Sequence, residues 1–132
     1  MTRTWRDPIV WSHAPIGMAA CLWMHSGAPA AWLALSVSTV LSVLHHRARE
    51  QSQRWRELDH LAAVAALLIT LGHFMAVANW DLMVQAFTLL ASALLAKELG
   101  DRYSYTVWHT AWHLLVALGQ AFLAWHYGVL SG

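Results

Sequence analysis

Apolar residues run along this chain in long blocks instead of alternating with polar ones. Five such blocks cover about 9–24, 31–46, 58–77, 82–99 and 105–127. An α-helix needs roughly 17–25 mostly apolar residues to cross a bilayer. The first two blocks are short for this, and Pro15 begins or kinks the first. The pattern predicts an all-α integral membrane protein with a single domain, residues 1–132, built from about five transmembrane helices.

The composition favours the same class of protein. The chain is 58% hydrophobic and 11% charged, whereas soluble domains carry roughly 25% charged residues. Its net charge of +1 gives no indication of nucleic-acid binding. Cys21 is the only cysteine, which excludes an internal disulfide and any multi-cysteine metal or redox motif. The expected surroundings are therefore a lipid bilayer, with no nucleic-acid partner.

The distribution of positive charge predicts an orientation. With five crossings, all eight Lys and Arg residues fall on the side of the N-terminus, while 25–30, 78–81 and the C-terminal tail contain none. The positive-inside rule places that N-terminus in the cytoplasm. A four-span arrangement, with the first block lying in the interface, keeps both charged loops cytoplasmic and remains open. In a bacterium the membrane would be the inner one.

This topology brings polar side chains from three helices to one membrane level, near the cytoplasmic face. His45 and His46 end the second block, Asp59 is expected in the first turn of the third, and His109 and His113 open the fifth. Residues four apart share a helix face, so His109 and His113 can bind one ion together. Ionisable groups in membranes are costly and usually functional. We therefore expect a metal site here.

Zinc is the expected ion, although copper and nickel accept the same ligands. Three imidazoles leave a fourth position for water, as in catalytic zinc sites, and zinc lowers the pKa of that water toward about 7. Asp59 would hold or deprotonate the water, and Ser42 would hydrogen-bond the oxyanion. Simpler interpretations stay open: His45 and His46 snorkel to the interface, Asp59 caps its helix, and Ser42 bonds its own helix.

The other histidines are expected to lie outside this site. Three of them near helix ends are interpreted as interfacial: His13, His25 and His126. His73 follows Asp59 by 14 residues, about 21 Å along a helix, and cannot reach the same ion. His60 points away from Asp59. At most, it would hydrogen-bond to one of the metal ligands without contacting the ion itself.

Three motifs in order resemble the CREST superfamily of membrane hydrolases. They are "SVLHH" read as S-x-x-x-H, an aspartate opening the next span, and "HTAWH" read as H-x-x-x-H in the last span. The superfamily includes alkaline ceramidases, progestin and adiponectin receptors, and proteins that remodel the lipids of GPI anchors. The resemblance implies zinc held by His46, His109 and His113, with Ser42 and Asp59 near the zinc-bound water. The spacing favours His46 over His45 as the ligand.

The expected function is therefore zinc-dependent cleavage of a lipid amide or ester, as in a ceramidase. Superfamily members usually have seven spans, so either the pocket is narrower here or a second copy of the chain, in a homo-oligomer, replaces the missing helices. The main alternative is a non-catalytic, zinc-stabilised membrane protein acting as a lipid sensor, scaffold or subunit. A haem held between His46 and His113 is a third hypothesis.

Overall fold

The computed structural model describes residue 4, residues 6–48 and residues 51–132, and it confirms the all-helical prediction. The helices are α1 (Pro8–Trp11), α2 (Ala14–His25), α3 (Pro29–Arg47), α4 (Gln53–Met75), α5 (Trp80–Arg102) and α6 (Tyr105–Ser131). The described part of the chain contains no β-strand. Each predicted apolar block is helical, and the first is divided into α1 and α2. Pro15 lies in the first turn of α2, as expected for a residue that cannot continue a preceding helix.

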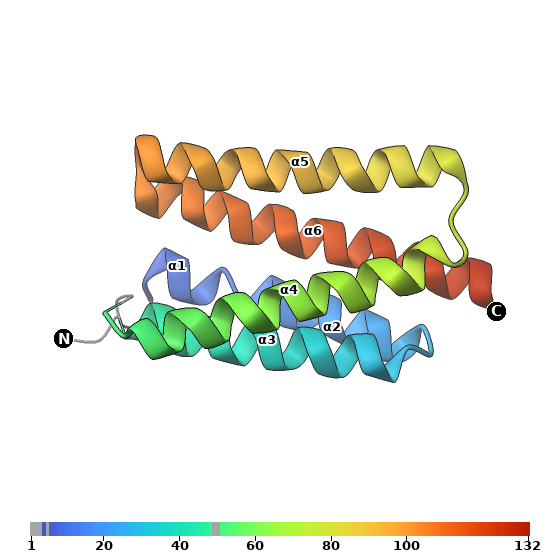
Figure 1. The fold of residues 1–132 in the computed structure, drawn as a ribbon, viewed down its shortest axis with the longest axis horizontal. Coiled ribbons are helices and arrows are strands. Elements are labelled where there is room, and N and C mark those ends of the chain that lie inside the picture. The colour runs from blue at the N-terminus through green and yellow to red at the C-terminus, as the bar shows by residue number, and fades with distance from the viewer. Residues whose placement is uncertain (1–3, 5, 49–50) are drawn as a thin grey trace.

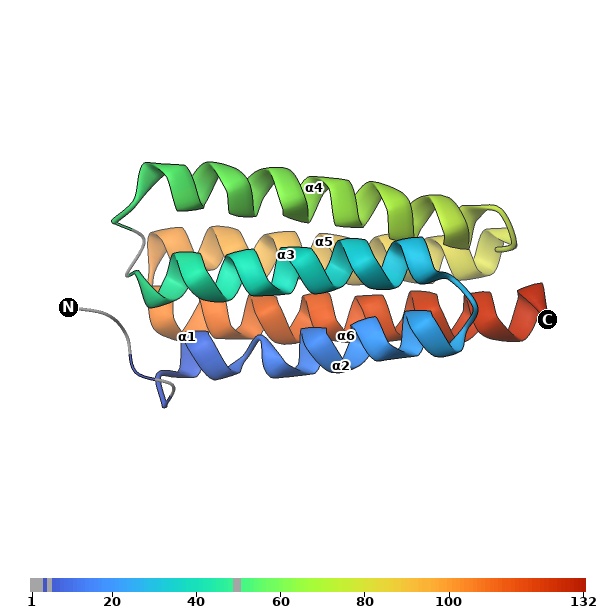
Figure 2. The same ribbon diagram turned by 90° about the horizontal axis from the view of Figure 1, so that it is seen from below.

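The long helices lie side by side along one axis and form a bundle around α6 (Figures 1 and 2). α2 packs against α3 and α6, and α3 packs against α4. α5 packs against the opposite side of α6 from α2 (Figure 1). Since α6 contacts α1, α2, α4 and α5, its side chains face most of the other elements. A site built on α6 can therefore draw residues from several helices.

Small residues line the closest helix contacts. Ala86, Ala93 and Gly100 are spaced seven apart on α5 and are buried, and a Cβ added to Gly100 would lie 3.5 Å from the backbone nitrogen of His109. At the other end of α6, a Cβ on Gly128 would lie 2.8 Å from Ser26 Oγ. Membrane helices associate through such small residues because they allow backbones to approach closely.

The outer surface of the bundle is largely apolar. α4, α5 and α6 are each long and apolar enough to cross a membrane, yet only 17–22% of their most apolar segments is buried inside the protein. Leu61, Phe87 and Leu118, for example, are 69%, 48% and 56% exposed. A soluble monomer rarely exposes so much contiguous apolar surface. The structure therefore supports a membrane protein with at least these three helices able to span the bilayer.

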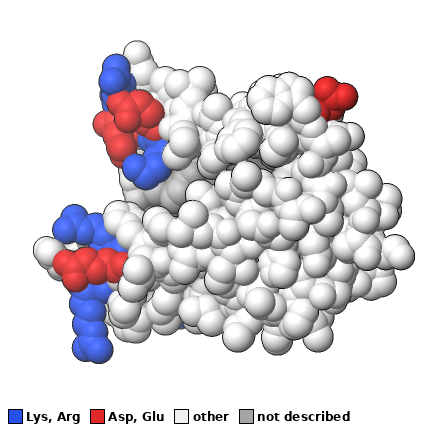
Figure 3. Space-filling view, turned by 45° about the vertical axis from the view of Figure 1, so that its right-hand side comes forward, with Lys and Arg blue, Asp and Glu red and all other residues white. Residues whose placement is uncertain are grey.

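Charged residues gather at one end of the bundle (Figure 3). The described Lys and Arg residues are Arg6, Arg47, Arg54, Arg56, Lys97 and Arg102. They lie before α1, at the end of α3, at the start of α4 and at the end of α5. Among the described acids, Asp81 lies in the first turn of α5, at the opposite end. Charged side chains are thus concentrated at one end of the bundle, whereas the apolar middle of the bundle carries few of them.

One predicted boundary is wrong. α4 begins at Gln53, with Ser52 as the N-cap whose side chain accepts from Trp55 N, so Asp59 lies in the second turn and does not cap the helix. The prediction followed hydropathy, which locates the apolar part of a helix. The preceding Gln, Arg and Glu residues are polar but are strong helix formers, and they extend α4 toward the charged end.

Candidate metal centre

Three buried histidines converge at the charged end of the bundle. His13, His46 and His113 each offer a ring nitrogen, and these nitrogens all lie within 4.8 Å of one another. The three side chains are only 1%, 2% and 2% exposed. They come from the α1–α2 junction, from the last turn of α3 and from the third turn of α6. Elements far apart in the sequence thus supply one imidazole each.

The break between α1 and α2 places His13 in this group. Pro15 has no N–H to donate to the carbonyl of Trp11, and its ring would clash with that carbonyl in a continuous helix. α1 therefore ends at Trp11, and α2 starts at Ala14. Ser12 and His13, between the two helices, are both fully or almost fully buried. Irregular backbone in an apolar environment is tolerated where protein surrounds it, as it does here.

Hydrogen bonds fix the ring orientations of two of the histidines. His13 Nδ1 lies 3.2 Å from the carbonyl oxygen of Val10, and since a carbonyl only accepts, Nδ1 carries the proton. Ser12 Oγ donates to the carbonyl of Ile9 at 2.8 Å and lies 2.8 Å from His113 Nδ1, so it accepts from that nitrogen. In both neutral rings, Nε2 is left with the lone pair that a metal needs.

His46 connects this group to a fourth histidine. Its Nε2 lies 3.2 Å from Nε2 of His109, and their rings meet edge to face. His109 stacks on the ring of Tyr105, with centroids 4.5 Å apart, and its centroid is 4.7 Å from that of His113. Four imidazoles therefore lie together in this part of the protein, with His46 in contact with each of the other three.

The residues predicted from the sequence fall in and around this cluster. His46 and His113 belong to the group of three, and His109 contacts His46. His45 is buried on the same helix but is not a member of that group. The burial of His45 and His46, at 5% and 2% exposure, excludes the interpretation that they extend to the interface.

The two predicted catalytic residues are placed differently. Ser42 Oγ lies 2.9 Å from Nε2 of His13, so its hydroxyl reaches across from α3 to the cluster. Asp59 is 7% exposed, on α4, which packs against α3. Asp59 is not a member of the three-histidine group. Ser42 is thus in direct contact with the candidate ligands, and Asp59 is a buried carboxyl on a neighbouring helix.

The interpretation of His13 as an interfacial residue is wrong. The signal was present in the sequence: the first block enters from the same side as the third and fifth, so a residue early in it reaches the depth of His109. Pro15 two residues later marks the break that turns the ring inward.

Other histidines lie outside the cluster, as expected: His25 and His60 are exposed. His73 packs against Trp23 and Tyr127.

The cluster fits a small cation better than a haem. Neutral imidazole nitrogen is a common ligand of zinc, copper and nickel, and His113 Nε2 is buried without a hydrogen-bond partner. Two nitrogens bound to one tetrahedral zinc ion lie roughly 3.3 Å apart, so the group needs only a small contraction. The rings of His13 and His109 lie 4.0–5.2 Å, centroid to centroid, from those of His46 and His113. They occupy the space that a porphyrin between His46 and His113 would need.

Comparison with known proteins gives no match: no family model, no curated protein and no solved structure is similar to this chain. The resemblance to the CREST superfamily accordingly depends on three short motifs. A functional assignment must depend on the geometry of the histidine cluster.

Proposed function

We propose that this protein is a zinc-dependent integral membrane hydrolase that cleaves a lipid amide or ester. The observation that carries the proposal is the convergence of buried imidazoles whose nitrogens lie within 4.8 Å of one another. His46 and His113 would hold the ion, and His13 and His109 are both in position to complete the set. Three protein ligands leave one position for water, the pattern of catalytic zinc.

The proposal includes an orientation in the membrane. α1–α2 and α3 would cross the bilayer together with α4, α5 and α6, giving five crossings. The concentration of described Lys and Arg residues at one end (Figure 3) supports a cytoplasmic location of that end, by the positive-inside rule. The histidine cluster, formed from the α1–α2 junction, the last turn of α3 and the first turns of α6, would then lie near the cytoplasmic face.

The chain's own residues would carry out the remaining steps. A bound zinc ion supplies a Lewis acid and a water that ionises near neutral pH. Ser42, whose hydroxyl is 2.9 Å from His13 Nε2, is placed to donate a hydrogen bond to the developing oxyanion. Asp59 would accept the proton from the attacking water and return it to the leaving group. Its burial on α4, away from the helix cap, supports a role other than helix capping.

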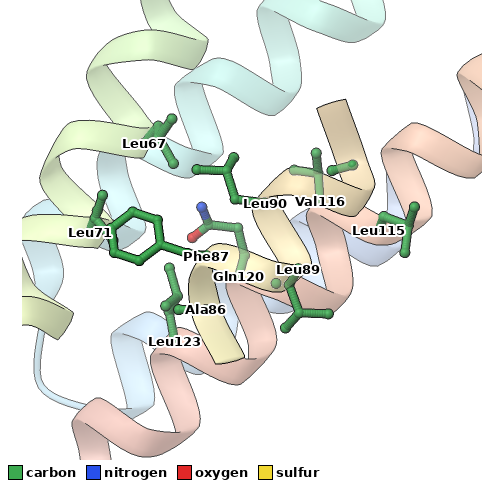
Figure 4. A pocket seen from close by; sticks show the side chains of 12 residues that line it. Leu67, Leu71, Ala86, Phe87, Leu89, Leu90, Leu115, Val116, Gln120 and Leu123 are labelled. Atoms are coloured by element: carbon green, nitrogen blue, oxygen red, sulfur yellow. The ribbon is translucent and has the colours of Figure 1, made fainter. Parts of the chain in front are cut away.

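An apolar recess in the surface supports a lipid as substrate. A pocket of about 60 Å³ lies among α4, α5 and α6 and is lined by side chains such as Leu67, Leu71, Phe87 and Leu90 (Figure 4). Gln120 of α6, which also lines it, follows His113 by seven residues, about 10.5 Å along the helix. A lipid entering sideways between α4 and α5 would place hydrocarbon in this recess and its polar linkage nearer the histidines.

Metal content tests the site directly. The protein would be purified in detergent and its zinc measured by mass spectrometry, beside His113→Ala and the control His126→Ala. His126 is on the same helix, against Phe122 at the opposite end. We expect about one zinc per chain in the wild type and the control, and little in His113→Ala. Undiminished zinc in His113→Ala would refute the metal centre.

A second variant separates an enzyme from a zinc-stabilised scaffold or lipid sensor. Asp59→Asn removes the proton acceptor and keeps the size of the side chain. If this protein is a hydrolase, Asp59→Asn keeps zinc and thermal stability but loses cleavage across a panel of ceramides and phospholipids. If zinc-loaded wild type cleaves none of these lipids, the hydrolase proposal is wrong and the non-catalytic alternative is favoured.

A further inference from the structure

We propose that the break in the first helix is part of the metal centre: His13 is a ligand, and Ser12 is a positioning residue that orients His113. The inference rests on the proposed metal site and adds two residues that the S-x-x-x-H and H-x-x-x-H motifs do not contain. Both come from the junction between α1 (Pro8–Trp11) and α2 (Ala14–His25).

The side chain of His13 does not cap the helix that follows it. His13 occupies the N-cap position of α2, yet its side chain makes no capping hydrogen bond. Its Nδ1–H donates a hydrogen bond to the carbonyl of Val10. This bond directs Nε2, on the other side of the ring, toward Ser42 on α3. The ring centroid is 4.0 Å from that of His113 and 5.2 Å from that of His46. The conformation of His13 is therefore explained by the cluster and not by capping.

Ser12 controls the orientation of His113 through a short chain of hydrogen bonds. The hydroxyl of Ser12 donates a hydrogen bond to the carbonyl of Ile9 at 2.8 Å. Its oxygen therefore accepts a hydrogen bond from His113 Nδ1–H, also at 2.8 Å. This leaves His113 Nε2 as an acceptor, and Nε2 is buried with no hydrogen-bond partner. An unsatisfied buried acceptor is costly, and a cation at the centre of the three rings would satisfy it.

The arrangement is that of a metal ligand with its supporting hydrogen bond. Metal-binding histidines almost always donate their second N–H to a neighbouring acceptor, which fixes the tautomer and the ring orientation. Val10 provides this acceptor for His13, and Ser12 provides it for His113. On binding of the ion by His13 Nε2, the hydroxyl of Ser42 would be released from that nitrogen and would remain beside the ion.

Zinc affinity of the full chain in detergent micelles tests the inference. Competition with a chelating dye would measure the dissociation constant, and Co²⁺ absorption would report the ligand set. The pairs to compare are His13→Ala with His25→Ala, and Ser12→Ala with Ser26→Ala. The two controls lie on or directly after α2, and the Ser26 hydroxyl donates to the carbonyls of Leu22 and Ala124 and contacts none of the clustered histidines.

We expect His13→Ala to weaken zinc binding by more than about 100-fold and to change the Co²⁺ spectrum. Ser12→Ala should weaken it by about 10–100-fold, as for other supporting hydrogen bonds, and Ser12→Thr should restore most of the loss because it keeps the hydroxyl. If His13→Ala does not fold, His13→Gln, which keeps a polar side chain, replaces it. Thermal unfolding of each apo-protein identifies any general loss of structure.

Three failures are distinguishable. If wild type binds zinc and His13→Ala binds it as tightly as His25→Ala, the inference is wrong and the metal centre stands. If wild type binds no zinc, the proposed function fails and the inference fails with it. Equal affinities of Ser12→Ala and Ser26→Ala would overturn the role of Ser12 alone.

Discussion

A buried glutamine in the middle of the bundle allows a quantitative test of the packing. Gln120 on α6 accepts a hydrogen bond from the indole of Trp23 at 3.0 Å and donates one to Thr70 Oγ1 at 3.1 Å. Thr70 in turn donates to the carbonyl of Ala66. Because an indole only donates and the hydroxyl proton of Thr70 is already used, the orientation of the Gln120 amide is unambiguous. One side chain thereby ties α6 to α2 and α4.

We predict that Gln120→Leu destabilises the protein by about 2–4 kcal/mol. Hydrogen bonds between membrane helices contribute about 0.6 kcal/mol on average and up to about 1.7 kcal/mol, so the two lost bonds account for roughly 1–3 kcal/mol. The substitution also leaves the Trp23 N–H buried without an acceptor, since Trp23 is 0% exposed, and an orphaned donor costs about 1–3 kcal/mol. The two contributions overlap, so their upper limits do not add.

A double-mutant cycle isolates the bond between the two side chains. Gln120→Leu, Trp23→Phe and the double variant would be unfolded with SDS in mixed micelles, and the free energy of unfolding compared with wild type. Once Trp23→Phe has removed the donor, Gln120→Leu should cost at least about 0.6 kcal/mol less than in the wild-type background. A coupling energy of zero within error would refute the proposed bond, because the cavity created by Phe cancels in the cycle.

Three further predictions concern packing, metal binding and topology. Gly128→Ala should lower stability by about 1–3 kcal/mol, because its Cβ would meet Ser26 Oγ at 2.8 Å, and Ser26→Ala should restore part of the loss in SDS unfolding. Zinc affinity should fall on acidification, since protons compete for the imidazole nitrogens, and the fall should begin below the pH range in which a free imidazole titrates, because His13 and His113 are buried; a dissociation constant that stays unchanged down to acid unfolding would exclude histidine ligation. For the topology, single cysteines would be introduced in a Cys21→Ser background and labelled with a membrane-impermeant reagent. With five crossings, Thr4→Cys should react only from the cytoplasm and Asn79→Cys only from outside. Labelling of Thr4→Cys from outside would favour four crossings.

Much of the local structure is determined by the sequence itself. Long apolar blocks predict the helices because a chain in lipid must satisfy its backbone hydrogen bonds internally. The spacing of His109 and His113 places them on one face of α6 because that spacing is nearly one helical turn. The alternating direction of successive helices then brings the end of α3 and the start of α6 to the same end of the bundle. These features depend on hydropathy, helical periodicity and the order of segments, and all three can be read without coordinates.

Only the tertiary structure decided which side chains meet. The sequence gives no measure of how far Pro15 turns the first helix, so hydropathy alone predicts an interfacial His13, although this side chain is 1% exposed and lies among the other histidines. The hydroxyl of Ser42 reaches His13, a contact between helices that the S-x-x-x-H spacing does not predict. Such partnerships depend on the rotation of each helix about its axis, which is set by close packing at small residues such as Gly100 and Gly128. Hydropathy depends on residue type alone and is unaffected by that rotation.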